Sequence, residues 1–85
     1  MTLHLTKQYQ KMYKKLPKKI QNLSLDTLQM LLDNPKDISL RLHQLKGSRS
    51  QFWSINIDHD YRILFLIDDT MYILQMIGTH AQLYG

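Results

Sequence analysis

The chain has 85 residues, too few to divide their apolar side chains between two cores, so we expect a single domain over residues 1–85. It contains no cysteine, which excludes disulfides, zinc–thiolate sites and thiol nucleophiles. The longest apolar stretch, residues 63–67, is far below the roughly 20 residues that span a bilayer, and residues 1–5 do not resemble a signal peptide. We therefore expect a soluble cytoplasmic protein with no membrane partner.

The net charge of +4 is unevenly distributed along the chain. Residues 1–49 hold ten of the eleven Lys and Arg residues but only three of the seven acidic residues. Four of the lysines fall on one stripe at helical spacing, namely Lys7, Lys11, Lys14 and Lys18. A solvated helix face is the plain interpretation, but the chain has no glutamate to neutralise them. The pattern favours a negative partner, either RNA or an acidic protein.

The first part of the chain predicts a strand followed by two helices. Alternating leucines in residues 3–5 predict a short strand, and Thr6 is a suitable N-cap for a helix over residues 7–15. Pro17 suits the first turn of a second helix, expected over residues 17–33 and ended by an Asn-Pro pair. Its expected buried face consists of Ile20, Leu23, Leu25, Leu28, Leu31 and Leu32. The two helices should form a hairpin across a sheet.

The second part of the chain predicts that sheet. Its apolar runs predict strands over residues 40–45, 52–58, 61–67 and 71–77. Gly47 ends the first of these, and a basic, flexible loop is expected at residues 48–51. In the second strand, Ser54, Asn56 and Asp58 alternate with apolar residues and are expected to face solvent. The order predicts an α+β fold: an N-terminal strand, a helical hairpin, then a three- to four-stranded antiparallel sheet.

Two short pieces of the chain are more specific, namely His43-Gln-Leu-Lys-Gly47 and Gly78-Thr-His-Ala-Gln-Leu-Tyr84. With the Lys-rich first helix, the Leu-Pro joint, the Trp-bearing strand and Asp60-Tyr-Arg-Ile-Leu-Phe65, they make the whole chain resemble the RelE/ParE toxin superfamily, closest to its YafQ-like branch. The resemblance implies a RelE-like fold and a messenger-RNA interferase. Such an enzyme is the toxin of a type II toxin–antitoxin system and cleaves mRNA in the ribosomal A site without a metal. It implies no cofactor, and its partners would be a cognate antitoxin, the ribosome and mRNA.

Carried over to matching positions, the resemblance implies catalytic roles for His43, Asp60 and His80. Asp60 would orient an imidazole or act as the base itself. The resemblance also implies an aromatic contact from Tyr84, where the branch usually has Phe, and an aromatic ring suits stacking of an unpaired base.

One position departs from the YafQ-like pattern, and another matches the RelE branch instead. Alignment on the aspartate puts Asn56 where the branch has a second histidine, so either His59 compensates from the turn or the activity is altered. Arg62 falls where the RelE branch, rather than the YafQ branch, uses an arginine on the scissile phosphate.

RNA cleavage by its own 2′-hydroxyl needs a base, an acid and a cation for the charge that builds on phosphorus. His43 and His80 suit the acid and base steps in either order, because imidazole titrates near neutrality. Arg62 and Lys46 supply donors to the phosphate oxygens, and Arg49 in the basic loop is expected to bind substrate.

Each candidate also has a plainer interpretation. His43 alone in a strand suits a structural role, Asp58 and Asp60 are typical turn formers, and Arg62 suits a partly buried ion pair. Two histidines and an aspartate from separate strands lack a recognisable metal-ligand spacing, so no metal site is expected.

Two rival functions remain open, a ParE-like gyrase poison and a non-catalytic RNA-binding module. Proton-transfer groups have no use in the first, whereas the basic half alone supports the second. For any toxin, we expect an antitoxin segment, either an amphipathic helix with acidic residues or an added edge strand, to cover a basic groove bordered by Tyr9, Tyr13 and Tyr84.

Overall fold

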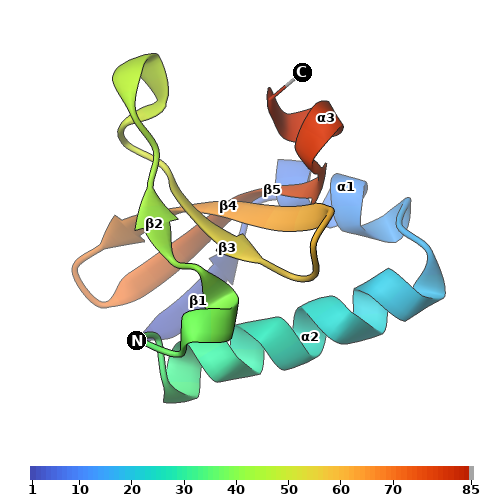
Figure 1. Ribbon diagram of the computed structural model, residues 1–85, viewed down its shortest axis with the longest axis horizontal. Coiled ribbons are helices and arrows are strands. Elements are labelled where there is room, and N and C mark those ends of the chain that lie inside the picture. Colours follow the sequence, from blue (N-terminus) through green and yellow to red (C-terminus); the bar gives the residue numbers. More distant parts are fainter. Residues whose placement is uncertain (85) are drawn as a thin grey trace.

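The computed structural model describes residues 1–84 and contains the expected order of elements (Figure 1). The helices and strands are β1 (Thr2–Leu5), α1 (Lys7–Lys14), α2 (Lys18–Asp33), β2 (His43–Gln44), β3 (Trp53–Asn56), β4 (Tyr61–Asp68), β5 (Met71–Thr79) and α3 (His80–Tyr84). Two short 3₁₀ helices, η1 (Ile38–Leu40) and η2 (Gly47–Arg49), flank β2. No helix within residues 1–84 is long and apolar enough to cross a membrane.

The strands form one five-stranded sheet in the order β1-β5-β4-β3-β2. The strands β2 to β5 pair antiparallel with their neighbours, whereas β1 joins the other edge parallel to β5 (Figure 1). The α+β class is therefore confirmed, and the N-terminal strand makes the sheet mixed.

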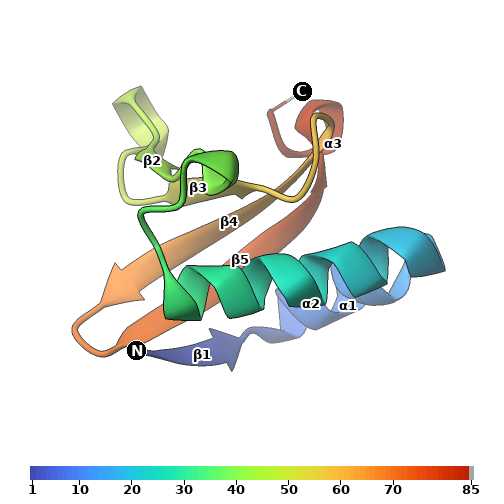
Figure 2. The same cartoon turned by 60° about the horizontal axis from the view of Figure 1, so that its bottom comes forward.

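The two faces of the sheet are covered differently. The helices α1 and α2 lie along one face, while α3 lies on the other (Figure 2). Register aligns Ile55, Ile63 and Ile77 across three strands on the α1/α2 face, and each is at most 1% exposed. These side chains form the centre of the hydrophobic core.

The helix starts confirm the capping signals. Thr6 Oγ1 accepts the Tyr9 N–H at 3.1 Å and donates to the Leu74 carbonyl at 2.8 Å. It therefore begins α1 and ties that helix to β5. Pro17 is the N-cap of α2, and Asn34 ends that helix before Pro35.

The expected buried face of α2 was partly wrong. Leu25 is 55% exposed, whereas Ser24 and Thr27 are buried. At about 100° per residue, Leu25 lies some 140° around the helix from Ile20, beyond the face that meets the core. The two small hydroxyl residues enter the interface because their Oγ atoms donate to carbonyls of their own helix, at 2.6 Å from Ser24 and 2.9 Å from Thr27.

The strand expected over residues 40–45 is much shorter. The Asp37 side chain accepts the Ser39 N–H at 2.9 Å and starts η1, and Arg41 follows in a left-handed conformation with φ of 47°. That conformation is incompatible with a strand, so only residues 43–44 pair with β3. The segment expected as a flexible loop at residues 48–51 begins as η2.

The third strand also differs from expectation. It spans Trp53–Asn56 rather than residues 52–58, and Ser54 is fully buried rather than facing solvent. Ser54 lies on the face that carries α3, where the Tyr84 hydroxyl reaches it at 3.3 Å. The alternation was correct, but a second layer covers the polar side of the strand.

Candidate functional site

A cavity of about 390 Å³ lies on the face of the sheet that carries α3. Its lining residues are Arg41, His43, Leu45, Asn56, Arg62, His80 and Tyr84. We call this cavity the histidine cleft. Five predicted site residues meet here, although they come from β2, β3, β4 and α3.

Strand register explains why these residues share one face. Asn56 pairs with Arg62, and Arg62 pairs with Gly78. His43 pairs with Ser54, two residues before Asn56, so it lies on the same side of the sheet. Because Gly78 has no side chain, this row leaves room for the side chain of Gln82 in α3.

The ring of His43 has a defined proton. Its Nδ1 lies 2.7 Å from the Arg41 carbonyl oxygen, which can only accept a hydrogen bond. Nδ1 therefore carries a proton, and in the neutral ring Nε2 has the free lone pair. The left-handed backbone of Arg41 sets the direction of this carbonyl. His43 is thus an exposed imidazole with the tautomer that suits a base.

His80 is positioned by a capping box at the start of α3. Thr79 Oγ1 accepts the Gln82 N–H at 3.1 Å, and Gln82 Oε1 accepts the Thr79 N–H at 2.9 Å. A Cβ on Gly78 would lie 2.6 Å from Gln82 Oε1, so only glycine leaves room for the box. The His80 N–H also donates to the Asp60 carbonyl at 2.9 Å. These contacts explain the Gly-Thr-His piece of the sequence in physical terms.

Tyr84 is held on several sides. Its ring centroid lies 4.5 Å from that of His80, one helical turn earlier. The Arg49 guanidinium lies 5.7 Å from the same ring, within cation–π range, and Arg49 Nη1 donates to the Leu83 carbonyl. The Tyr84 hydroxyl donates to Ser54 Oγ. Arg49 therefore links the segment between β2 and β3 to the C-terminal end of α3.

Arg62 donates to backbone carbonyls of the β3–β4 turn. Nη1 reaches the carbonyls of Asp58 at 2.7 Å and Tyr61 at 3.1 Å, and Nη2 reaches that of His59 at 2.9 Å. A guanidinium has five N–H donors, so these contacts leave about two for another acceptor in the cleft. Arg62 thus supports the turn and keeps the capacity to bind an anion.

Asp58 organises the same turn. Its carboxylate accepts the N–H groups of Asp60 at 2.9 Å and Tyr61 at 2.7 Å. Partial burial would raise its pKa, but these two hydrogen bonds and the charges of His59 and Arg62 lower the pKa below its usual value. The interpretation of Asp58 as a turn former is therefore confirmed.

Four predicted site residues do not line the histidine cleft: Asp60, His59, Lys46 and Arg49. Asp60 and His59 are exposed in the β3–β4 turn, and Asp60 reaches the site through its backbone carbonyl. Lys46 precedes η2 at the surface. Among residues 1–84, no three His, Asp or Glu side chains gather closely enough to hold a metal ion.

Sequence reasoning missed two contributions to the site. The structural role of the Arg41 carbonyl depends on a left-handed backbone that no local pattern indicated. The capping box was detectable, because Thr79 followed three residues later by Gln82 is its signature.

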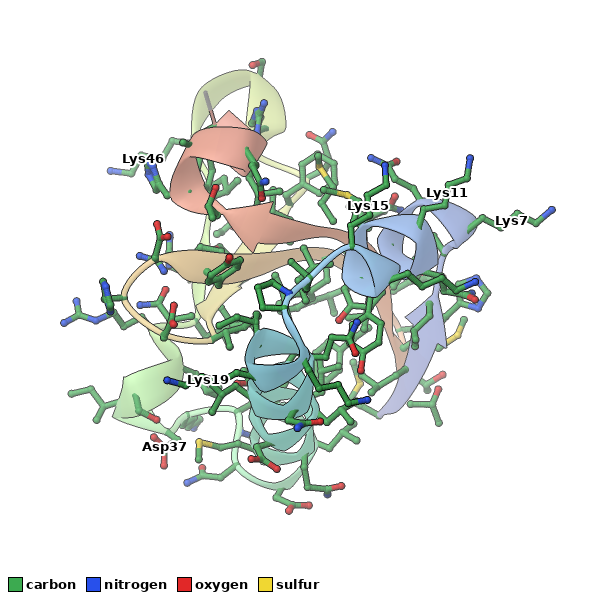
Figure 3. The ribbon with its side chains drawn as sticks, turned by 90° about the vertical axis from the view of Figure 1, so that its right-hand side faces the viewer. Lys7, Lys11, Lys15, Lys19, Asp37 and Lys46 are labelled. Atoms are coloured by element: carbon green, nitrogen blue, oxygen red, sulfur yellow. The ribbon has the colours of Figure 1, made fainter. Side chains whose placement is uncertain are left out.

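The basic surface lies apart from the cleft. Lys7, Lys11 and Lys15 project from α1 and its C-cap, whereas Lys19 belongs to α2 (Figure 3). The expected stripe is interrupted because α1 ends at Lys14 and Lys18 starts α2.

The groove expected between Tyr9, Tyr13 and Tyr84 is not one surface. Tyr9 is 1% exposed and belongs to the core. With Tyr13 it lines a cavity beside α1 and α2, whereas Tyr84 lines the histidine cleft.

Comparison with known proteins assigns the chain to a class of bacterial toxins. The family model described as the bacterial toxin of type II toxin–antitoxin systems, YafQ, matches residues 1–85. The chain therefore belongs to the YafQ toxin family. No curated protein sequence gives a significant match.

Solved structures of similar fold agree with this family. E. coli YafQ is 21% identical with a TM-score of 0.83, and the alignment covers 98% of this chain and 97% of that one. The YafQ structure in the E. coli DinJ–YafQ toxin–antitoxin complex is 23% identical with a TM-score of 0.81, covering 98% and 96%. Helicobacter pylori HP0894 is 27% identical with a TM-score of 0.76, covering 99% of each chain.

Proposed function

We propose that this toxin is a metal-independent endoribonuclease that cleaves mRNA in the ribosomal A site. The observation that carries the proposal is the pair His43 and His80 in one cleft with Arg62. General base, general acid and phosphate-binding cation are the three groups that 2′-hydroxyl attack requires.

In the proposed reaction, His43 Nε2 takes the proton of the 2′-hydroxyl, because its Nδ1–H is occupied by the Arg41 carbonyl. The 2′-oxygen bonds to phosphorus, and the bond from phosphorus to the 5′-oxygen breaks. His80 gives a proton to the leaving 5′-oxygen, while the remaining Arg62 donors stabilise the charge on the phosphoryl oxygens. The products are a 2′,3′-cyclic phosphate and a 5′-hydroxyl.

Asp60 is assigned a positioning role in this scheme. Its carbonyl accepts the His80 N–H, and its exposed carboxylate does not line the cleft. Asn56 and Tyr84 line the cleft and are proposed to contact the nucleotide, by hydrogen bonding and stacking respectively. The ribosome would present the mRNA as an ordered single strand to this open site.

We further propose that an acidic antitoxin inhibits the toxin in the cell. The solved DinJ–YafQ complex pairs that E. coli relative with an antitoxin. In the present chain, α1 carries no acidic residue in its first turn and ends with Lys11 and Lys14. The neighbouring cavity offers apolar contact area and is lined by Leu5, Tyr9, Gln10, Tyr13, Lys14, Leu25 and Leu28. Charge and apolar area together suit an amphipathic acidic segment.

Replacement of His80 tests the enzymatic proposal. If His80 is the general acid, His80→Gln lowers cleavage of ribosome-bound mRNA by about 10²-fold or more. Primer extension on a translated transcript measures this, and circular dichroism checks the fold. His4→Gln is the matched control, because His4 is an exposed histidine in β1, outside the cleft.

Cleavage at the parental rate by a folded His80→Gln protein would contradict the nuclease mechanism. If the wild-type protein does not cleave ribosome-bound mRNA, a gyrase supercoiling assay tests the ParE-like alternative, and RNA binding without either activity would support a binding module.

A further inference from the structure

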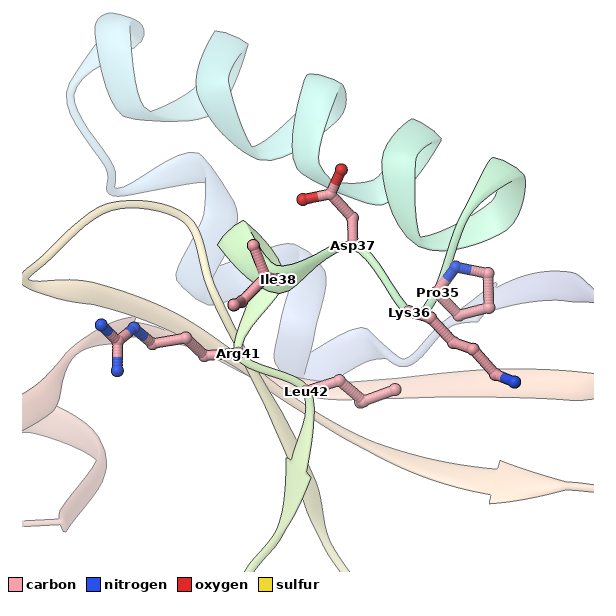
Figure 4. Close-up of a pocket in the computed structure, with 6 residues that line it drawn as sticks. All are labelled: Pro35, Lys36, Asp37, Ile38, Arg41 and Leu42. Carbon is pink, nitrogen blue, oxygen red and sulfur yellow. The ribbon is translucent and has the colours of Figure 1, made fainter.

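We propose that a second cavity binds the nucleotide next to the cleavage site on the same single-stranded RNA. This cavity of about 470 Å³, which we call the loop groove, is lined by Pro35, Lys36, Asp37, Ile38, Arg41 and Leu42 (Figure 4). The inference rests on the proposed function, because it extends the RNA path beyond the histidine cleft.

Continuity between the two cavities is the first argument. Arg41 lines both the loop groove and the histidine cleft. Its carbonyl accepts the Nδ1–H of His43 at 2.7 Å, so the residue lies directly beside the proposed base. An RNA strand that places a 2′-hydroxyl at His43 therefore passes Arg41 with its adjacent phosphate.

The chemistry of the groove suits a nucleotide. Ile38 is 90% exposed, more than any other large apolar residue among residues 1–84, and provides a surface for a base or ribose. The exposed cations Lys36 and Arg41 project in opposite directions along the loop (Figure 4). They are arranged to contact phosphates on either side of a nucleotide at Ile38.

Asp37 is the acidic residue that lines the groove, and its carboxylate accepts hydrogen bonds from its own segment. Asp37 Oδ1 accepts the Ser39 hydroxyl at 2.6 Å and the Ser39 N–H at 2.9 Å. These hydrogen bonds, first from the hydroxyl and then from the backbone, lower the pKa of Asp37 and fix its carboxylate on η1. The groove therefore presents to a ligand the cations of Lys36 and Arg41, the apolar side chains of Pro35, Ile38 and Leu42, and one carboxylate that is hydrogen-bonded to Ser39.

The backbone of Arg41 has an energetically unfavourable conformation. A φ of 47° is uncommon for a residue other than glycine, and it is held by the Arg41 N–H bond to the Ile38 carbonyl at 3.2 Å. Such outliers cluster at functional sites.

Binding of 2′-O-methyl RNA tests the proposal, because this RNA lacks the nucleophilic hydroxyl and is not cleaved. Fluorescence anisotropy is measured with a trinucleotide and a nonanucleotide. The wild-type protein should bind the longer strand more tightly. Arg41→Asn should lower the affinity for the nonanucleotide by about tenfold. Asparagine is chosen because it tolerates the left-handed backbone. For this variant, the slope of log affinity against log salt concentration should become shallower by about 0.7 per lost phosphate contact.

Two further variants separate the possible outcomes. Ile38→Ser should lower the affinity for the nonanucleotide by about fivefold, because it removes the apolar contact. The affinity for the trinucleotide should stay unchanged. Lys7→Ala removes one positive charge from the distant α1 helix (Figure 3) and should leave the length dependence intact. Two results would overturn the loop-groove site alone. One is an equal loss of affinity for the nonanucleotide in Lys7→Ala and Arg41→Asn, and the other is equal affinity of the wild-type protein for both strands. A wild-type protein that binds neither strand overturns this site and the proposed RNA contact together.

Discussion

The two faces of the sheet divide the protein into a part that stabilises the fold and a part that carries the candidate site. On the α1/α2 face, Ile55, Ile63 and Ile77 are aligned and buried. On the opposite face, Asn56 and Arg62 occupy the adjacent positions of the same strands and line the histidine cleft. Neighbouring residues along one strand therefore serve different purposes, because side chains alternate between the faces.

Adjacent substitutions in β3 should give the largest contrast between the faces. Ile55→Ala should lower the free energy of unfolding by about 2–5 kcal/mol, because it leaves a cavity in the core. Asn56→Ala should lower it by less than about 1 kcal/mol, because Asn56 is only partly buried at the edge of the cleft. Urea denaturation measures both. Similar losses for the two variants would contradict the division of the faces.

Loss of Arg49 should loosen the site face without affecting the core. Arg49→Gln removes the charged donor to the Leu83 carbonyl and the cation over Tyr84, contacts worth about 1–2 kcal/mol in total. Hydrogen exchange should accelerate in residues 80–84 and stay unchanged in β4. Lys46→Gln is the control, because it removes a nearby positive charge without those contacts. Unchanged exchange in residues 80–84 of Arg49→Gln would show that Arg49 does not anchor α3.

Replacement of Asp58 in the β3–β4 turn should have a smaller, pH-dependent effect on the free energy of unfolding. Asp58→Ala removes two hydrogen bonds to backbone N–H groups and should cost about 1 kcal/mol at neutral pH. Because the folded pKa of Asp58 is lowered, its stabilisation is present above the unfolded value of about 3.9 and is lost as pH falls further. The difference in unfolding free energy between wild type and Asp58→Ala should therefore shrink below about pH 4. A difference independent of pH would exclude the charged carboxylate as its source.

A single polar atom in the core offers the smallest test. The Tyr9 hydroxyl is buried with no hydrogen-bond partner among residues 1–84, so Tyr9→Phe should be neutral or stabilise the protein by up to about 1 kcal/mol. Burial, and then the neighbouring Tyr13, raise the pKa of Tyr9. Its neutral form is favoured in the folded state, so the wild type should lose stability above about pH 10 relative to Tyr9→Phe. Thermal denaturation across this range measures the difference, and destabilisation by Tyr9→Phe at pH 7 would indicate a missing partner.

Local pattern in the sequence determined the strongest elements of the fold. The apolar runs of β4 and β5 and the cap at Thr6 were predictable because strand period, helix period and capping are short-range properties. The capping box of Thr79 and Gln82 was missed, although it was detectable for the same reason, because it is contained within four residues.

Only the tertiary structure decided which polar residues meet. Register across β2, β3 and β4 brought His43, Asn56 and Arg62 to one face with His80, and it left Asp60 outside the cleft. The burial of Ser54 depended on α3 folding back over β3. Side-chain period fixes the face of a strand residue, whereas sheet order, register and covering layers depend on contacts between residues distant in the sequence. That is why residue types could suggest a chemistry for the candidate site, whereas its geometry depended on the tertiary structure.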